Sequence, residues 1–258
     1  PLLGRHFDPV IGVRRWRRTV KSKIAALESW ASAEKPEARI YLDGQPKQLA
    51  PRLYYLGEHE GTAGYVVDAG SGGLVCVDPA GRDRKSLDET LAKLDLKSTD
   101  VKTVLLTGVH PSHSAGARAL CDSLSAQLWC GPVSQSAPAR ERLKPDRELK
   151  PSSDIELGDV KIRVLAGVRA AGADLCYVVK TEKHLALLGG DSVLRFPKPQ
   201  RDVHPELDEA TVIDPELSLL SIEAVMSLPI DLLLPAHPRL EQSPLFLPGE
   251  WQERFKRR

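Results

Sequence analysis

The stretch "LLTGVHPSHSAGARAL" at residues 105–120 decides the fold, because within 16 residues its pattern changes from strand-like to turn-like and then to helix-like. It begins inside the continuous apolar and β-branched run "VKTVLLTG", which is typical of a strand covered on both faces. It ends in the helix-like segment "SAGARALCDSLS". Between the two, His110 and His113 lie on a turn of Gly, Pro and Ser residues. The sequence therefore predicts polar side chains at the carboxyl end of a buried strand, where an α/β sheet usually builds its site.

Hairpins and helices alternate on either side of this stretch. Strand-like runs around turn residues predict hairpins at residues 64–78 and 175–191. Amphipathic spacing predicts helices at residues 85–96 and 215–229. The run "VKIRVLA" at residues 160–166 alternates apolar and charged residues, which predicts a half-buried strand. Hairpins and helices thus alternate once in each half of the chain, which indicates an α/β fold with sheets packed between helices.

The composition narrows the class of protein. The chain has 258 residues, 41% of them hydrophobic, which is enough for one large domain with a core and an extension. The net charge of +1 provides no overall field to attract nucleic acid or a membrane surface. We find no apolar run of the roughly 20 residues that a membrane helix needs, and no signal-peptide pattern at the start. The four cysteines lie in apolar segments without a CxxC pair, which predicts buried thiols in a reducing, cytoplasmic compartment.

The first 50 residues differ from the rest. Apolar residues step by three and four across residues 8–35, which predicts an amphipathic helix that ends before Pro36. Its part "RRWRRTVKSK" is strongly basic. We therefore expect residues 1–50 to form a basic helix and linker, and residues 51–258 to form the main domain. The basic face is either solvated or the contact to an anionic surface or a protein partner.

Three polar clusters directly follow apolar strand runs. They contain His110 and His113, then Gly190 and Asp191, and finally His237 after "LLLPA". Imidazole and carboxylate groups that meet at strand ends are ligands that zinc favours. Because an HxxH turn is also common in proteins without a metal, the spacing alone leaves a structural role open for each of these residues.

The order of these pieces resembles the metallo-β-lactamase-fold hydrolases over residues 51–245. The matching segments are "LVCVDPAG", "LLTGVHPSHSAG", "VLAGVRAAGAD", "LLGGD" and "LLLPAH". The resemblance implies an αββα sandwich, two packed sheets flanked by helices, behind the N-terminal helical extension. It also implies that Asp78, at the end of the first segment, supports the site from behind.

The metal ligands of that family are only partly present. The family signature supplies His, His, Asp and His, and the matching positions here are Gly108, His110, Ser112 and His113. The second histidine segment of the family aligns with Arg169. The resemblance therefore implies that one metal position has lost most of its ligands, and a fixed positive charge at Arg169 would repel a cation from it.

The other metal position keeps a usable set. Asp191 matches the bridging aspartate of the family and His237 matches its last histidine. Together with His113 they make two imidazoles and one carboxylate, which suit one zinc ion, or ferrous iron as an alternative. His110 is the remaining candidate ligand. Arg169 is expected either to pair with Asp191 or to bind an anionic group.

Two functions follow from the resemblance. The first is a metal-dependent hydrolase with a reduced, single-metal site and an activated water, in which His110 moves a proton and Arg169 stabilises developing negative charge. The second is a catalytically inactive pseudoenzyme without a cofactor, a scaffold whose basic helix docks to a partner. Nucleic-acid processing and iron-dependent oxidation are further roles compatible with the fold. The sequence does not identify the small-molecule substrate.

Overall fold

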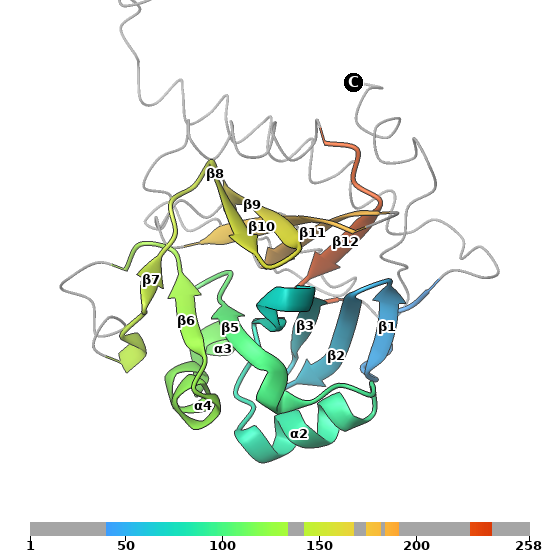
Figure 1. The fold of residues 1–258 in the computed structure, drawn as a ribbon, viewed down its shortest axis with the longest axis vertical. Helices are drawn as coiled ribbons and strands as arrows, with labels where there is room; N and C mark the ends of the chain where they lie inside the picture. The colour runs from blue at the N-terminus through green and yellow to red at the C-terminus, as the bar shows by residue number, and fades with distance from the viewer. Residues whose placement is uncertain (1–39, 134–141, 168–173, 182–183, 191–227, 239–258) are drawn as a thin grey trace, which may run out of the picture.

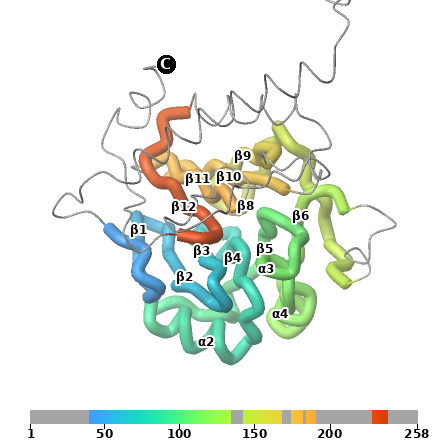
Figure 2. The backbone as a smooth tube through the Cα atoms, turned by 180° about the vertical axis from the view of Figure 1, so that it is seen from behind, coloured from blue at the N-terminus to red at the C-terminus, as the bar shows by residue number. Residues whose placement is uncertain are grey.

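Two β-sheets packed face to face form the body of the protein, with helices on the outer face of one of them (Figures 1 and 2). The computed structural model describes residues 40–133, 142–167, 174–181, 184–190 and 228–238. The N-terminal helix predicted at residues 8–35 lies outside these ranges, as do residues 215–227 of the helix predicted at residues 215–229. Residues 228 and 229 are described and are not helical.

The first sheet has seven strands in chain order, and it changes from antiparallel to parallel in its middle. Its strands are β1 (Lys47–Ala50), β2 (Leu53–His59), β3 (Thr62–Asp68), β4 (Leu74–Val77), β5 (Val101–Leu105), β6 (Gln127–Cys130) and β7 (Arg147–Glu148). Strands β1 to β4 pair antiparallel, and β4 to β7 pair parallel. The hairpin predicted at residues 64–78 is thus confirmed as β3 and β4, and the carboxyl ends of β4 and β5 reach the same edge.

The second sheet has five strands in the order β12-β11-β10-β9-β8. They are β8 (Ser153–Leu157), β9 (Val160–Ala166), β10 (Leu175–Lys180), β11 (Leu185–Gly190) and β12 (Leu232–Pro235). Strands β8 to β11 form an antiparallel meander, and β12 pairs parallel with β11. The carboxyl ends of β11 and β12 therefore also meet at one edge, which brings the segments that precede Asp191 and His237 together.

Helices cover the outer face of the first sheet. They are α2 (Arg84–Ala92) and α4 (Ala117–Leu124). The single turn α3 (Pro111–Ser114) and the 3₁₀ turns η1 (Gly70–Gly72) and η2 (Ser98–Asp100) lie in the connections between elements. Helix α2 begins where the Asp83 carboxylate accepts the Ser86 backbone N–H at 2.7 Å, an N-cap that satisfies an otherwise unpaired donor. Figure 1 shows α2 and α4 lying along this face of the sheet. The buried residues of α2 and α4 pack in one cluster with outward residues of β4 and β5.

The main core lies between the sheets. On β9, Val160, Ile162 and Val164 are buried in it, whereas Lys161 and Arg163 are exposed. This period of two is the alternation expected of a strand with one face on the core, and it confirms the half-buried strand predicted there. All four cysteines are buried and unbonded to one another, as their apolar surroundings predicted.

The first sheet begins before residue 51, where the main domain was expected to start. Strand β1 pairs with β2 from Lys47, and Leu42 and Leu49 are buried in the core, so the packed body extends before residue 51. Among the described residues no helix is long and apolar enough to cross a membrane.

Candidate metal centre

A buried carboxylate organises the first half of the candidate site. Asp78 follows β4 and is 2% exposed, and its Oδ1 accepts the Thr107 backbone N–H at 2.8 Å. Its Oδ2 accepts the Thr107 hydroxyl and lies 3.0 Å from Nδ1 of His113, which is also buried. Because a carboxylate accepts hydrogen bonds, His113 carries its proton on Nδ1 and directs the lone pair of Nε2 away from Asp78. This contact is the supporting role predicted for Asp78.

The second sheet contributes His237, and a hairpin of the first sheet orients it. Its Nδ1 lies 2.7 Å from the carbonyl oxygen of Gly61, in the turn between β2 and β3. The Ala63 backbone N–H donates to the Ala236 carbonyl at 2.7 Å, which ties the same hairpin to the chain beside His237. Figure 2 shows β12 lying next to β3. A carbonyl only accepts, so His237 also holds its proton on Nδ1.

The two imidazoles suit a metal ion. The ring centroids of His113 and His237 lie 6.1 Å apart, edge to face. Both Nδ1 atoms face oxygen acceptors, which is how metal-binding histidines are commonly oriented, with Nε2 as the donor atom. The donor set therefore fits a divalent cation such as zinc. Within the described residues no three His, Cys, Asp or Glu side chains lie close enough together to hold a metal ion. The predicted third ligand, Asp191, lies outside those residues.

His110 has a different environment. It is exposed and forms the N-cap of α3, where its Nδ1 lies 2.8 Å from the Ser112 hydroxyl and accepts the Ser112 backbone N–H at 3.3 Å. Ser112 occupies the position where the family resemblance expects an aspartate. Nδ1 of His110 is therefore engaged with Ser112 in the same turn.

Arg169 also lies outside the described residues, but the ends of its segment are anchored at the site. The Gly167 backbone N–H donates to the Asp174 carbonyl at 2.7 Å, so the chain returns beside itself after residues 168–173. The next residue, Leu175, donates its N–H to the Thr107 carbonyl at 2.7 Å. Gly190, at the end of β11, accepts from the Ala236 N–H at 3.1 Å. The chain thus re-enters the second sheet beside Thr107 after residues 168–173. It leaves β11 at Gly190, beside the residue that precedes His237.

Two buried tyrosines tie the site strands across the sandwich. The Tyr65 hydroxyl of β3 donates to the Pro235 carbonyl of β12 at 2.7 Å. The Tyr177 hydroxyl of β10 donates to the Leu106 carbonyl, just after β5, also at 2.7 Å. Burial raises the pKa of both phenols well above 10.0, so they remain protonated donors. Each bond joins one sheet to the strand end that carries a site residue in the other.

The loop after Asp78 is held by Arg82, which is 4% exposed. Its guanidinium donates to the carbonyls of Pro79, Leu56 and Gly57 at 2.9 to 3.2 Å. Burial lowers the pKa of Arg82, but an arginine remains charged, and the three carbonyls replace the water it has lost. The loop that positions Asp78 is therefore fixed to β2.

Four residues that support the candidate site were not predicted from the sequence: Thr107, Gly61, Tyr65 and Tyr177. Thr107 carried a signal, since it is the first polar residue after the buried run of β5. The other three carried none, because their partners are far away in the chain. Tyr65 and Pro235, for example, are separated by 170 residues.

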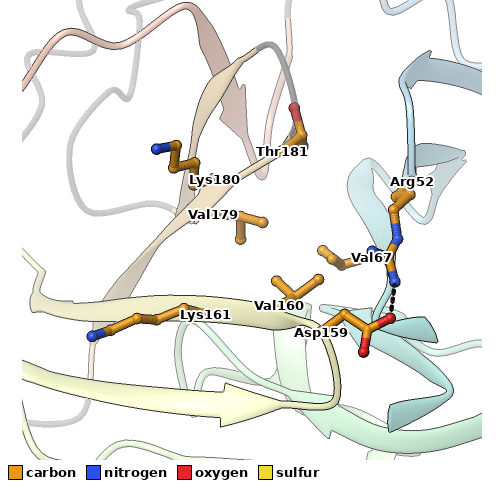
Figure 3. A pocket seen from close by; sticks show the side chains of 8 residues that line it. All are labelled: Arg52, Val67, Asp159, Val160, Lys161, Val179, Lys180 and Thr181. Carbon is orange, nitrogen blue, oxygen red and sulfur yellow. Dashed lines mark hydrogen bonds and ion pairs between the residues drawn. The ribbon is translucent and has the colours of Figure 1, made fainter. Parts of the chain in front are cut away.

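A hollow of about 300 Å³ opens at the opposite end of the sandwich (Figure 3). Its lining residues come from the far ends of β3, β9 and β10 and their neighbours: Arg52, Val67, Asp159, Val160, Lys161, Val179, Lys180 and Thr181. Arg52 pairs with Asp159 at 3.2 Å, and Lys161 with Asp154 at 2.9 Å. Figure 3 shows both lysine chains extending away from the three valines. This hollow therefore contains none of the predicted site residues.

Comparison with solved structures gives the same fold. The chain superposes on BJP-1, a subclass B3 metallo-β-lactamase of Bradyrhizobium japonicum, with a TM-score of 0.60 at 22% identity, over 83% of this chain and 91% of that one. The metallo-β-lactamase MIM-2 gives 0.63 at 20% identity, over 88% and 92%. The class B3 di-zinc enzyme LRA-12 from an Alaskan soil metagenome gives 0.58 at 18% identity, over 80% and 84%.

These identities show a shared fold, an αββα sandwich, and leave the chemistry of this chain open. No curated protein matches the chain. The family model of the metallo-β-lactamase superfamily matches residues 57–237, from the hairpin that holds His237 to His237 itself. The chain therefore belongs to the metallo-β-lactamase superfamily.

Proposed function

We propose that this chain is a metal-dependent hydrolase with a single-metal site formed by His113, Asp191 and His237. The observation that carries the proposal is the pair of imidazoles at 6.1 Å, each with Nδ1 turned to an oxygen acceptor of the protein. With Nδ1 of each ring facing an oxygen acceptor, Nε2 is the atom that carries the lone pair, as is common in metal-binding histidines. Asp191 would complete a set of two imidazoles and one carboxylate.

A zinc ion, with ferrous iron as the alternative, would supply Lewis acidity and lower the pKa of a water to about 7. The residues of the chain supply the rest. Asp78 fixes the tautomer of His113 and is itself held by Thr107. His110, exposed at the start of α3, is the proposed carrier of a proton between the site and solvent. Arg169 is the proposed partner of negative charge on the substrate.

The substrate class follows from the reaction type alone. Water activation suits acyl and phosphoryl compounds, so thioesters, lactones, β-lactams and phosphodiesters are the compounds to screen. The similar solved structures are named as β-lactamases, which makes a β-lactam the first compound to test.

The decisive experiment is the metal content of protein purified without chelator. We expect about one zinc or iron per chain, lost in the double variant His113→Ala, His237→Ala. His184→Ala is the matched control, because His184 lies at the other end of the β10–β11 hairpin, where the Thr181 hydroxyl accepts its backbone N–H. No bound metal in the unchanged protein would contradict the proposal. Two metals per chain would show that the ligand alignment is wrong.

A second candidate function is a metal-free scaffold of the same fold, acting in the cytoplasm. The observation that favours it is His110, whose Nδ1 is bonded to Ser112 at the position of a missing ligand. In that case the proposed basic helix within residues 1–50 is the functional end. Binding of the full chain to anionic vesicles would then weaken steeply as salt rises, because exposed charges are screened.

A further inference from the structure

Gly108 opens a space that another side chain occupies. A Cβ atom built on Gly108 would lie 3.1 Å from Oδ1 of Asp174 and 3.6 Å from Cδ2 of His113. Any side chain at position 108 would therefore point between the His113 ring and the Asp174 carboxylate. The glycine, which stands where the family resemblance expects a histidine, leaves room for this carboxylate.

Asp174 is fixed there by its backbone. Its carbonyl accepts the Gly167 N–H, and the N–H of the following residue, Leu175, donates to the Thr107 carbonyl, each at 2.7 Å. These bonds connect Asp174 to the end of β9 and to the chain after β5. The side chain is half-buried, so its charge is only partly screened by solvent.

We propose that Asp174 supplies the metal centre with the carboxylate that its histidine turn lacks, and that it does so across Gly108. The inference rests on the proposed function. Ser112 has replaced an acidic residue of the family pattern, which removes one negative charge from the site. Asp174 would restore one negative charge near His113, where its carboxylate would orient water bound to a cation held by the histidines.

The geometry indicates an indirect role rather than direct coordination. Among the described side chains, Asp174 does not form a metal-holding group with His113 and His237. A carboxylate one water molecule away orients that water and favours the cation by charge. Replacing such outer partners typically costs about 10- to 100-fold in metal affinity.

The test is the zinc affinity of the full chain, measured by competition with a chromophoric chelator. Asp174→Asn keeps the shape and removes the charge, and we expect it to weaken zinc binding about 10- to 100-fold. Asp159→Asn is the matched control, because Asp159 is an exposed aspartate at the far end of the sandwich, paired with Arg52. It should leave the zinc affinity unchanged. Urea unfolding of the metal-free variants checks that neither change acts through loss of the fold.

A position swap gives a second readout. Gly108→Ala should also weaken zinc binding, because its Cβ would lie 3.1 Å from Asp174 Oδ1 and would push the carboxylate out of its position by a few tenths of an ångström. Gly108→His should weaken it further, and the double variant Gly108→His, Asp174→Ala should recover zinc binding, since the added imidazole then has space and can act as a ligand. A purely structural Asp174 would give no such recovery.

The outcomes separate the two proposals. Zinc binding by the unchanged chain that is equal in Asp174→Asn and Gly108→Ala would overturn this inference and leave the proposed function standing. Absence of zinc binding in the unchanged chain would overturn both. If Asp174→Asn fails to fold, the comparison of Gly108→Ala with the double variant decides the question alone.

Discussion

At the scale of single residues, Asp78 connects the core to the candidate site. One buried carboxylate accepts from the Thr107 N–H, the Thr107 hydroxyl and His113 Nδ1. Its φ of 46° lies in the left-handed region, which aspartate tolerates better than most residues. The family resemblance of the segment "LVCVDPAG" implied a supporting role for Asp78. The choice of His113 Nδ1 as its partner was not predictable, because the two residues meet only through the pairing of β4 with β5.

Asp78→Ala should lower the free energy of unfolding by about 3 kcal/mol, because it leaves buried donors on Thr107 and His113 without their acceptor. Asp78→Asn should cost less, since its amide oxygen still accepts one of these bonds and asparagine tolerates a positive φ. Urea unfolding of the metal-free protein measures both. An Asp78→Ala variant as stable as the parent would show that the carboxylate is dispensable to the fold.

At the scale of elements, β4 shows what happens to a strand covered on both sides. Val75 and Val77 face the core between the sheets, and Leu74 and Cys76 face the layer of α2 and α4. Burial raises the pKa of the Cys76 thiol from 9.0 to about 12, with a smaller contribution from Cys121 nearby. The Cys76 thiol therefore stays protonated at neutral pH while the strand remains buried.

This burial predicts a pH dependence of stability. The folded thiol holds its proton up to about pH 12 whereas the unfolded thiol ionises from 9.0, so its contribution is complete below pH 9.0 and is lost as pH rises towards 12. Between about pH 8 and pH 10, the parent should lose about 1.4 kcal/mol more than Cys76→Ala in urea unfolding. A difference between the two proteins that stays constant with pH would contradict the prediction.

The elements differ in how far the sequence predicts them. Strands β3, β4, β5 and β9 to β12 carry apolar runs or strict alternation and were predictable. Strand β7 is two exposed residues, "RE", which pair with β6 and carry no apolar pattern of their own. Strand β2 contains Gly57 with a φ of 78° at a register shift, which interrupts its pattern. Such elements arise from tertiary pairing, which a local reading of the sequence does not include.

At the scale of the whole molecule, the site lies on residues from both sheets, and its geometry depends on how the sheets are joined. His113 follows β5 of the first sheet and His237 follows β12 of the second. Tyr65 and Tyr177 each donate a hydrogen bond from one sheet to the other, close to these residues. The order of motifs along the chain was enough to predict the sandwich. The hydrogen bonds of the tyrosines between the sheets were not predictable, because nothing in the local sequence of either one indicates its acceptor.

Tyr65→Phe and Tyr177→Phe should each lower the free energy of unfolding by about 1 to 2 kcal/mol, because each leaves a buried carbonyl without a donor. Tyr54→Phe is the matched control. Its ring lies on the outer, half-buried face of β2, and the change expected there is within about 0.5 kcal/mol. Thermal or urea unfolding of the three variants tests this. Equal effects at all three positions would show that the two buried bonds contribute nothing specific.

The division of the chain between the sheets has one more consequence. Every strand of the first sheet precedes every strand of the second, so residues 47–148 and 153–235 are consecutive halves. His113 and His237 are carried by different halves, with ring centroids 6.1 Å apart, so their separation depends in part on how the sheets pack. A larger or smaller side chain in the core between the sheets, far from either histidine, would then change that separation. Under the proposed single-metal site, the separation that the ion requires of the two histidines would therefore limit which substitutions the core accepts during neutral drift.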